Sequence, residues 1–599
     1  MVELYIDNTA VVLPSDLSSE IVIANSFFTK NGEYTYDIKL SLKNAINAAL
    51  YKQLNRLNSV AEVTSQRRAK LIIDNRTYID GTEIITDWDD DSVSIQLASG
   101  NSELNYFIGS DKLISSLDMG TAGLGDQVSS DSLFYPYPDF DYVLAPVYNR
   151  SVDEVINCWW VRAERDPIPG LPSNYYMPND ASAHAQPYLS AMIEKIITAL
   201  GYTIGINQFA TSVFKDLFIL NTVERNLYSK MLPGWTAKEF LEEIEKLFNL
   251  CFIIDRTSKK CNILFANSFY IGAPEVHLSA VEDEYEVEID EKSDGDVTSA
   301  NVSYDLPNNE YFRFRRLTSV IKNKAEYIQL AGYSAIKQYF STAEAGKMVI
   351  AIDTTNGRKY CKDVMGEGSQ LYTSRPIDEF CDLDRGSNAE IKISICPAEM
   401  SFYTFNEETT APFISYIPCI DSSSTTDSPT TENSIEGLIE SGADEVEESK
   451  NKIFLAFYHG PVNFASGLEY QYPLSTPDQL PIDNINLVGK WDEDKSLRFH
   501  VLNRLLYSGV YTIDTTKTYT FYSSDPNVPD THSIFVIDNK RFVCRELSYT
   551  ISKAEKVKRW KLKMHPIEIS DTEALSRWIL SDSKWRDGGV WLDDGRWLD

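Results

Sequence analysis

Over much of the chain, apolar residues alternate with polar ones or gather in short runs, which is typical of β-strands. Residues 93–97 alternate valine, isoleucine and leucine with serine and glutamine, and predict a half-buried strand. Residues 4–13, 71–79 and 535–543 each place an Asp-Asn pair between two apolar runs. Asp and Asn tolerate left-handed backbone angles, so each pair predicts a tight hairpin. The three hairpins indicate either duplicated domains or three independent turns, and the sequence leaves both open.

Helical spacing occurs in three places. Leucine and isoleucine four residues apart predict a helix over residues 42–57, and an apolar face followed by glycine predicts another over 191–200. In residues 231–265, Thr236 and Glu239 form a capping box ahead of a third amphipathic helix. Two apolar runs then flank residues 256–260, so this region predicts a helix followed by a hairpin, a small α+β module.

These patterns predict a multidomain, mainly β fold with α+β modules and no transmembrane segment. We expect seven parts: an N-terminal β-rich domain (1–110), a Pro- and Tyr-rich connection (111–155), a helix–hairpin domain (156–270), a β-rich domain (271–415), a flexible acidic Ser/Thr-rich insertion (416–452), a C-terminal β-rich domain (453–570) and a Trp-rich tail peptide (571–599).

Composition narrows the function classes. The formal net charge of −32 argues against sequence-specific DNA binding, which needs clustered Lys and Arg. The eight cysteines are scattered without a C-x-x-C pair, so neither a zinc site nor a disulfide framework is indicated, and we expect reduced thiols. The N-terminus lacks the pattern of a signal peptide, so we expect synthesis in a cytoplasm.

The sequence gives no sign of catalysis. It holds no zinc-protease, nucleophile-elbow or phosphate-loop motif, and its six histidines are far apart. Asp139 and Asp141 lie among aromatics and are the best-placed carboxylate pair for a glycosidase, but such loops more often cover a sheet edge. We therefore expect no enzyme activity, no cofactor and no metal site.

An acidic segment alternates with apolar residues near the middle of the chain, as in a strand with one strongly negative face. It is either a solvated face or the wall of a DNA conduit, which would repel phosphates and prevent sticking. The acids concerned are Glu282, Asp283, Glu284, Glu286, Glu288 and Asp290.

The C-terminal tail carries tryptophans every six or seven residues, at Trp578, Trp585, Trp591 and Trp597. Glycine and aspartate between them favour an extended or looped peptide. Tryptophan is enriched at binding hot spots, so we expect a partner-binding tail. Self-packing and sugar binding are the alternatives.

The segment 231–241 with its following hairpin, residues 100–105, the N-terminal hairpin and the 535–547 hairpin together resemble tail hub or baseplate hub proteins of phages and prophages, particularly those of Bacteroidota. The resemblance covers about half of the chain and excludes residues 411–452 and the Trp tail. It implies two hub-like β-barrel domains per chain and a homotrimer that mimics six-fold symmetry. It also implies a virion location at the distal end of the tail, around the DNA exit channel.

We therefore expect a structural hub that joins the tail tube to distal tail-tip proteins, lets DNA pass non-specifically during genome ejection and has no membrane span. A receptor- or carbohydrate-binding tail protein is the first alternative. A polysaccharide-degrading tail enzyme is the second.

Overall fold

A computed structural model describes most of the chain, in many segments. The described residues are 2–29, 32–56, 67–104, 112–123, 128–149, 154–157, 161–164, 174–177, 183–223, 226–255, 259–278, 280–289, 301–306, 326–342, 349–355, 359–362, 382–383, 390–405, 409–416, 452–463, 471–477, 494–507, 511–525, 530–552, 557–569, 577–578 and 596–597.

The chain divides into two compact units, each assembled from segments far apart in sequence. Unit 1 comprises Met1–Phe107, Cys251–Ser293 and Leu506–Asp599, and unit 2 comprises Ile108–Leu250 and Asp294–Leu505. Unit 2 is thus inserted in two pieces into unit 1. The finer division into seven parts stays a prediction.

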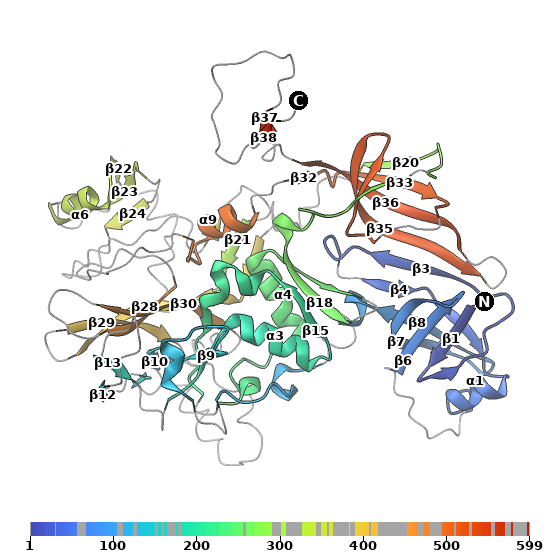
Figure 1. Ribbon diagram of the computed structural model, residues 1–599, viewed down its shortest axis with the longest axis horizontal. Helices are drawn as coiled ribbons and strands as arrows, with labels where there is room; N and C mark the ends of the chain where they lie inside the picture. The colour runs from blue at the N-terminus through green and yellow to red at the C-terminus, as the bar shows by residue number, and fades with distance from the viewer. Residues whose placement is uncertain are drawn as a thin grey trace. The chain divides into compact units, whose positions relative to one another are not determined.

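Unit 1 is built on one fifteen-stranded sheet (Figure 1). Its N-terminal strands are β1 (Val2–Ile6), β2 (Thr9–Ala10), β3 (Ser18–Ala24), β4 (Glu33–Thr35), β5 (Ile38–Ser41), β6 (Arg67–Ile73), β7 (Arg76–Trp88) and β8 (Ser92–Ser99). Its later strands are β19 (Glu275–His277), β20 (Glu286–Ile289), β32 (Tyr511–Ile513), β33 (Lys517–Ser523), β34 (Ile534–Ile537), β35 (Lys540–Ser552) and β36 (Val557–Ile569).

The two halves of this sheet repeat one pairing scheme. Hairpin β6–β7 continues into β8, as hairpin β34–β35 continues into β36. On the far side of β8 lie β4 and β5, and on the far side of β36 lies β33. β3 then pairs with β4 as β20 pairs with β33. These matching pairings favour duplication over independent hairpins.

The register agrees at the level of single residues. In the first half, a row across the strands runs Val22–Tyr34–Ala98–Thr82. In the second half, the corresponding row runs Glu286–Thr520–Lys563–Glu546. Thr82 and Glu546 occupy the same place relative to the Asp-Asn turn that precedes each strand. Since a slip of one residue would reverse every side chain, this match is specific.

A register irregularity also repeats. In the β7–β8 pair the register shifts between Ile85 and Asp87, at Thr86. In the β35–β36 pair it shifts between Tyr549 and Ile551, at Thr550. A bulge bends its strand and increases the local twist, so both halves bend at the equivalent position.

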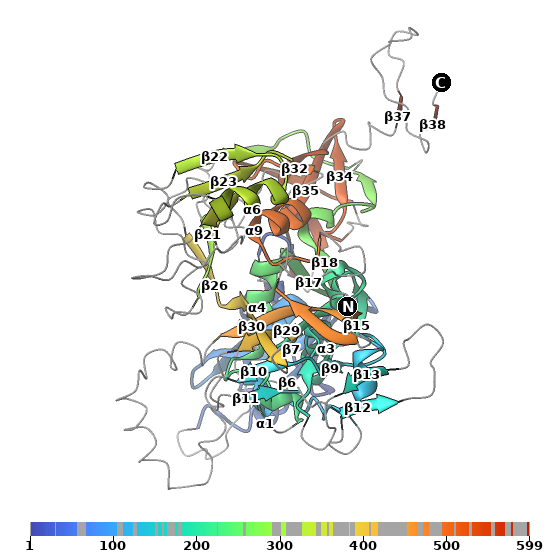
Figure 2. The same cartoon turned by 90° about the vertical axis from the view of Figure 1, so that its left-hand side faces the viewer.

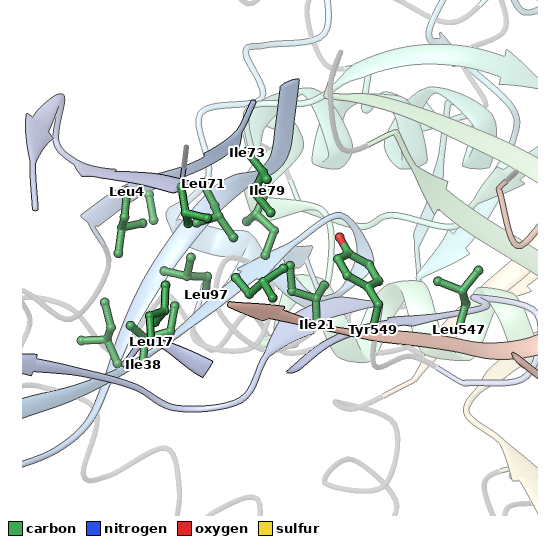
Figure 3. Packing of buried hydrophobic residues seen from close by; sticks show 14 of the residues in the cluster. Leu4, Leu17, Ile21, Ile38, Leu71, Ile73, Ile79, Leu97, Leu547 and Tyr549 are labelled. Carbon is green, nitrogen blue, oxygen red and sulfur yellow. The ribbon is translucent and has the colours of Figure 1, made fainter. Parts of the chain in front are cut away.

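The halves join where β3 pairs antiparallel with the second part of β35, from Ser18↔Ser552 to Ala24↔Glu546. One apolar core spans this junction, and Figure 3 shows Ile21 of β3 beside Tyr549 of β35. Both side chains are buried. Burial of an aliphatic or aromatic side chain stabilises the folded state by about 1.5–3 kcal/mol, so this junction contributes to the stability of unit 1.

The three predicted Asp-Asn hairpins are confirmed. Their turn residues, Asp7, Asn8, Asp74, Asn75, Asp538 and Asn539, all have φ between 48° and 65°. Two consecutive positive φ angles suit a tight turn whose twist matches that of the strands.

The helix predicted over residues 42–57 is wrong in extent, because α1 covers only Ala45–Leu50. Asn44 caps its start, and Lys52 and Gln53 take positive φ angles just after its end. The left-handed backbone at these two positions stops the helix although the leucine spacing continues. Unit 1 also holds the single-turn helix α2 (Asn101–Glu103) and, after the strand β17 (Leu250–Ile254), the strand β18 (Lys260–Phe265).

Unit 2 holds several smaller sheets. Their orders are β11-β10-β29-β28, β12-β13-β31-β30-β16 with β27 beside β30, β14-β9, β25-β21-β26 and β22-β23-β24. The strands are β9 (Tyr142–Val143), β10 (Val147–Asn149), β11 (Glu154–Ile156), β12 (Val161–Glu164), β13 (Asn174–Met177), β14 (Gln186–Pro187), β15 (Thr203–Asn207), β16 (Leu217–Ile219), β21 (Asn301–Tyr304), β22 (Glu326–Leu330), β23 (Val349–Asp353), β24 (Lys359–Lys362), β25 (Asp382–Leu383), β26 (Glu390–Ile393), β27 (Ile395–Pro397), β28 (Glu399–Phe405), β29 (Thr409–Tyr416), β30 (Ile453–Asn463) and β31 (Gln471–Thr476).

The α-helices among the described residues of unit 2 are α3 (Leu189–Ala199), α4 (Ala237–Phe248), α6 (Tyr333–Thr342) and α9 (Phe499–Leu502). The predicted capping box of α4 is present, with Thr236 and Glu239 bonding reciprocally. Figure 2 shows α6 beside β22 and β23, with which it shares a small core. In the part of the chain that the structure describes, no helix is long and apolar enough to span a membrane.

The predicted fold class, multidomain and mainly β with few helices, is confirmed. The predicted insertion at 416–452 lies outside the described residues apart from its ends, Tyr416 and Lys452.

Candidate interaction edges

The acidic segment forms the outermost strand at one end of the long sheet. β20 pairs with β33 on one side, from Glu286↔Thr520 to Ile289↔Lys517. On its other side, no strand among the described residues pairs with it. An edge strand presents unpaired N–H and C=O groups, to which another strand can add.

Both faces of this edge are exposed. The carboxylates of Glu286 and Glu288 lie on one face, and these side chains and that of Glu284, just before the strand, are open to solvent. On the other face, Ile289 is 78 % exposed. Large exposed apolar side chains are the unusual feature here, because a strand at the rim of a finished protein normally buries one face.

The start of the acidic segment is held in place. Glu282 forms an ion pair with Arg559 of β36, whose guanidinium lies 3.9 Å from the centre of the Tyr522 ring. The Glu282 N–H also donates to the Tyr522 carbonyl at 2.9 Å. Further along, the Tyr285 ring lies 5.7 Å from that of Phe521. The segment is therefore positioned by the sheet before any partner binds.

Five of the six acids proposed for a conduit wall, Glu282 to Glu288, are exposed in the structure. Asp290 lies outside the described residues. Whether these side chains face DNA stays a prediction.

A second uncovered edge lies on β7. Its first part, up to Glu83, pairs with β6, whereas Ile84–Trp88 has β8 on one side and no described strand on the side of β6. Trp88 is 53 % exposed. This edge had no distinct signal in the sequence, because β7 reads as one continuous strand.

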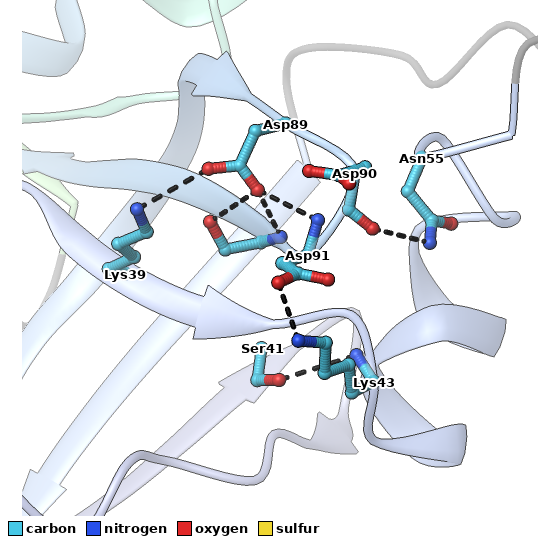
Figure 4. A network of polar contacts seen from close by, with 8 residues as sticks. Lys39, Ser41, Lys43, Asn55, Asp89, Asp90 and Asp91 are labelled. Carbon is cyan, nitrogen blue, oxygen red and sulfur yellow. Dashed lines mark hydrogen bonds and ion pairs between the residues drawn. The ribbon is translucent and has the colours of Figure 1, made fainter.

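The turn that follows this edge is rigid. Asp89 accepts hydrogen bonds from the N–H groups of Asp91 and Ser92, at 2.8 and 2.6 Å, and from the Ser92 hydroxyl (Figure 4). These bonds stabilise its carboxylate and lower its pKa to about 2. Lys39 and Lys43 form ion pairs with Asp89 and Asp91, which offset the charge of two of the three consecutive acids of this turn.

Of the carboxylate pair considered for glycoside cleavage, Asp139 is exposed and Asp141 is half-buried. Asp141 forms an ion pair with Lys195 at 2.8 Å, and the Lys195 ammonium lies 4.5 Å from the centre of the Tyr228 ring. The Asp139 N–H donates to the Pro136 carbonyl in a turn. The bonding here stabilises the loop that carries these acids. Among the described residues, no group of three or more His, Cys, Asp or Glu side chains has an arrangement that could hold a metal ion.

Two of the four tail tryptophans fall in described segments. The two-residue strand β37 (Arg577–Trp578) pairs in parallel with β38 (Arg596–Trp597). Trp585 and Trp591 lie outside the described residues. The backbone of the tail therefore returns to itself at these two points, which suits a looped peptide, and its partner stays a prediction.

No protein-family model and no curated protein matches this chain. Among solved structures, the chain is similar to the 43 kDa tail protein of prophage MuSo2 from Shewanella oneidensis, at 8 % identity and a TM-score of 0.29, over 94 % of this chain and 97 % of that one. It is also similar to the tail protein from Neisseria meningitidis MC58, at 8 % identity and a TM-score of 0.27, over 94 % and 95 %. Both TM-scores are too low to establish a shared fold or function.

Proposed function

We propose that this chain is a non-enzymatic structural hub at the distal end of a phage tail, where it forms a homotrimer around the DNA exit channel. The observation that carries the proposal is the duplicated sheet of unit 1, in which one side of β20 and one side of the second part of β7 have no partner among the described strands. Repeated units with two open ends suit a closed ring, because ring closure leaves no edge unpaired.

A ring of three chains would contain six copies of the repeated sheet. Such a ring offers near-six-fold symmetry to a tail tube on one side and three-fold symmetry to tail-tip proteins on the other. The sequence resemblance to hub proteins supports the same assembly. The acidic face of β20 suits a channel wall, since repulsion of phosphates acts over roughly 8 Å at physiological salt.

The oligomer is tested by native mass spectrometry of the purified full-length chain, which should give three times the mass of one chain. A monomer at every accessible concentration, and inside the particle, would overturn the hub proposal. Imaging of the intact particle with the chain labelled should place it at the tail tip. Particles that assemble fully without this chain but fail to adsorb would favour the receptor-binding alternative.

The channel wall is tested by genome ejection. Particles carrying Glu286→Lys and Glu288→Lys should assemble and eject DNA more slowly, because lysines attract phosphates. The matched control changes two exposed acids of unit 2, Asp118→Lys and Glu326→Lys, and should leave ejection unchanged. Equal ejection rates in both variants would exclude the conduit role of β20.

A further inference from the structure

The two halves of unit 1 differ in what covers one equivalent strand. β3 and β20 occupy the same position in the repeated pairing scheme, with Val22 equivalent to Glu286 and Ile21 equivalent to Tyr285. β3 is covered by β35, and Ile21 is fully buried. β20 has no such cover among the described strands, and Tyr285 is 57 % exposed.

The same asymmetry occurs on the strand that provides the cover. β35 and β7 are equivalent, both are thirteen residues long, and each follows an Asp-Asn turn. In β35 the second part is paired with β3, and Tyr549 is buried. The equivalent part of β7, Ile84–Trp88, has no partner strand on that side in the described part of the chain, and Ile85 is only half-buried.

We infer that residues 282–286 of one copy, which lead into β20, pair antiparallel with the Ile84–Trp88 edge of β7 in a second copy of this chain. The pairing reproduces between copies the β3–β35 junction that exists within one chain. It rests on the proposed ring, and it names the strands that close it.

The internal junction also fixes the register. Ile21 lies opposite Tyr549 and Val22 lies opposite Ser548 in the β3–β35 pair. Transferred to the equivalent residues, Tyr285 of one copy lies opposite Ile85 of the next, and Glu286 lies opposite Ile84. The exposed Tyr285 thereby gains an apolar cross-strand partner, a pair that contributes roughly 0.2–1 kcal/mol beyond the backbone bonds.

The contact is heterologous, because one copy offers residues 282–286 and the other offers the second part of β7. A heterologous contact generates a ring when its rotation closes and a filament when it does not. Each copy carries both edges. A copy that joins the assembly therefore covers one open edge and leaves its own second edge open, until the last contact closes the ring.

Disulfide trapping tests the register in the full-length chain. The variant Glu286→Cys with Ile84→Cys places two cysteines directly opposite, where Cα atoms of antiparallel partners are about 4.5–5.5 Å apart and suit a disulfide. Mild oxidation should link the chains covalently, with a yield at least about tenfold above that of the control Glu286→Cys with Ile85→Cys, whose side chains point to opposite faces. The single variant Glu286→Cys measures how much linkage forms through the native cysteines.

Hydrogen–deuterium exchange of the unaltered chain gives an independent measurement. Amides in residues 84–88 and 282–286 should exchange more slowly in the assembled form than in dilute, dissociated protein. A trimer that forms without in-register linkage and without protection of these segments overturns the inference but leaves the hub proposal standing. A chain that stays monomeric overturns both.

Discussion

The side-chain amide of Asn25 donates a hydrogen bond to the Tyr270 hydroxyl at 2.7 Å inside the core of unit 1, although 245 positions separate the two residues in the chain. The same nitrogen lies 3.1 Å from the carbonyl oxygen of Thr531 and 2.7 Å from that of Cys544. Asn25 thus ties the turn after β3 to segments on both sides of the second piece of unit 2, and so links three parts of unit 1 that are far apart in the chain.

Replacing Asn25 should destabilise unit 1 strongly. Asn25→Ala leaves buried acceptors without a donor, and each unsatisfied group costs about 1–3 kcal/mol, so we expect a loss of about 3 kcal/mol in the free energy of unfolding. Tyr270→Phe removes a single bond to the same network and should cost only about 1 kcal/mol. Urea denaturation, monitored through a signal that comes from unit 1, measures the free energy of unfolding of both variants. An equal loss in the two variants would show that the amide is not the centre of the network.

Acid should weaken unit 2 through His459. Its Nε2 lies 2.8 Å from the Thr476 hydroxyl oxygen, and burial, aided by the charge of Lys495, lowers its pKa from 6.5 to about 3. The folded state therefore holds this ring neutral, whereas the unfolded chain binds a proton below pH 6.5. The contribution of the neutral ring to the free energy of unfolding of unit 2 is fully present above pH 6.5. It is lost as the pH falls towards 3, at up to about 1.4 kcal/mol per pH unit.

The measurement is the stability of unit 2 between about pH 7 and pH 4, compared with that of His459→Gln. The glutamine keeps a polar group near Thr476 but cannot titrate, so the variant should lose less stability on acidification. Parallel pH profiles of the two proteins would exclude His459 as the titrating group.

Assembly should become stronger when Asp87 loses its negative charge. In the proposed register, Asp87 of one copy lies opposite Asp283 of the next, and like charges directly opposite are destabilising. Asp87→Lys should therefore lower the concentration at which trimers form and reduce the gain from added salt, which otherwise screens the repulsion. Sedimentation at low and high ionic strength measures both effects.

The matched control is Asp118→Lys, an exposed residue of unit 2 with the same change of charge. If both variants shift assembly equally, net charge is responsible and the register gains no support.

Truncation after Ser570 should separate folding from attachment. β36 is the last described strand of the duplicated sheet along the chain, and the tail strands β37 and β38 pair with each other in a sheet of their own. The shortened chain should therefore fold and trimerise, with the distal proteins missing from assembled tails. Loss of folding would instead indicate a self-packing tail, and complete particles that fail to adsorb would indicate a receptor- or sugar-binding tail. Electron microscopy, thermal melting and adsorption assays distinguish these results.

Local rules were sufficient for several elements of this protein. The Asp-Asn pairs are hairpin turns because these residues accept positive φ, and Thr236 with Glu239 starts α4 because both caps lie within one helical turn. Such features depend on neighbours a few residues apart, and the sequence displays them directly. The same local reasoning predicted too long a helix at residues 42–57, because the leucine spacing continues past the left-handed positions Lys52 and Gln53.

The alternation in the acidic segment predicted a strand with one negative face, and β20 has that form. Its position at the end of the sheet was not predictable, because β20 and its partner β33 are separated by the second piece of unit 2. The uncovered part of β7 was hidden for a similar reason, since its sequence differs little from that of a covered strand.

The sequence by itself determined the turns, the caps, the alternation and the charge of this protein, since each follows from the conformational preferences of residues close together in the chain. Only the tertiary structure decided that β3 is covered by β35 while β20 has no second partner among the described strands. That difference arises from pairing between strands more than five hundred residues apart, such as Val22 with Ser548, and no local preference encodes which of two equivalent edges finds its partner within the chain.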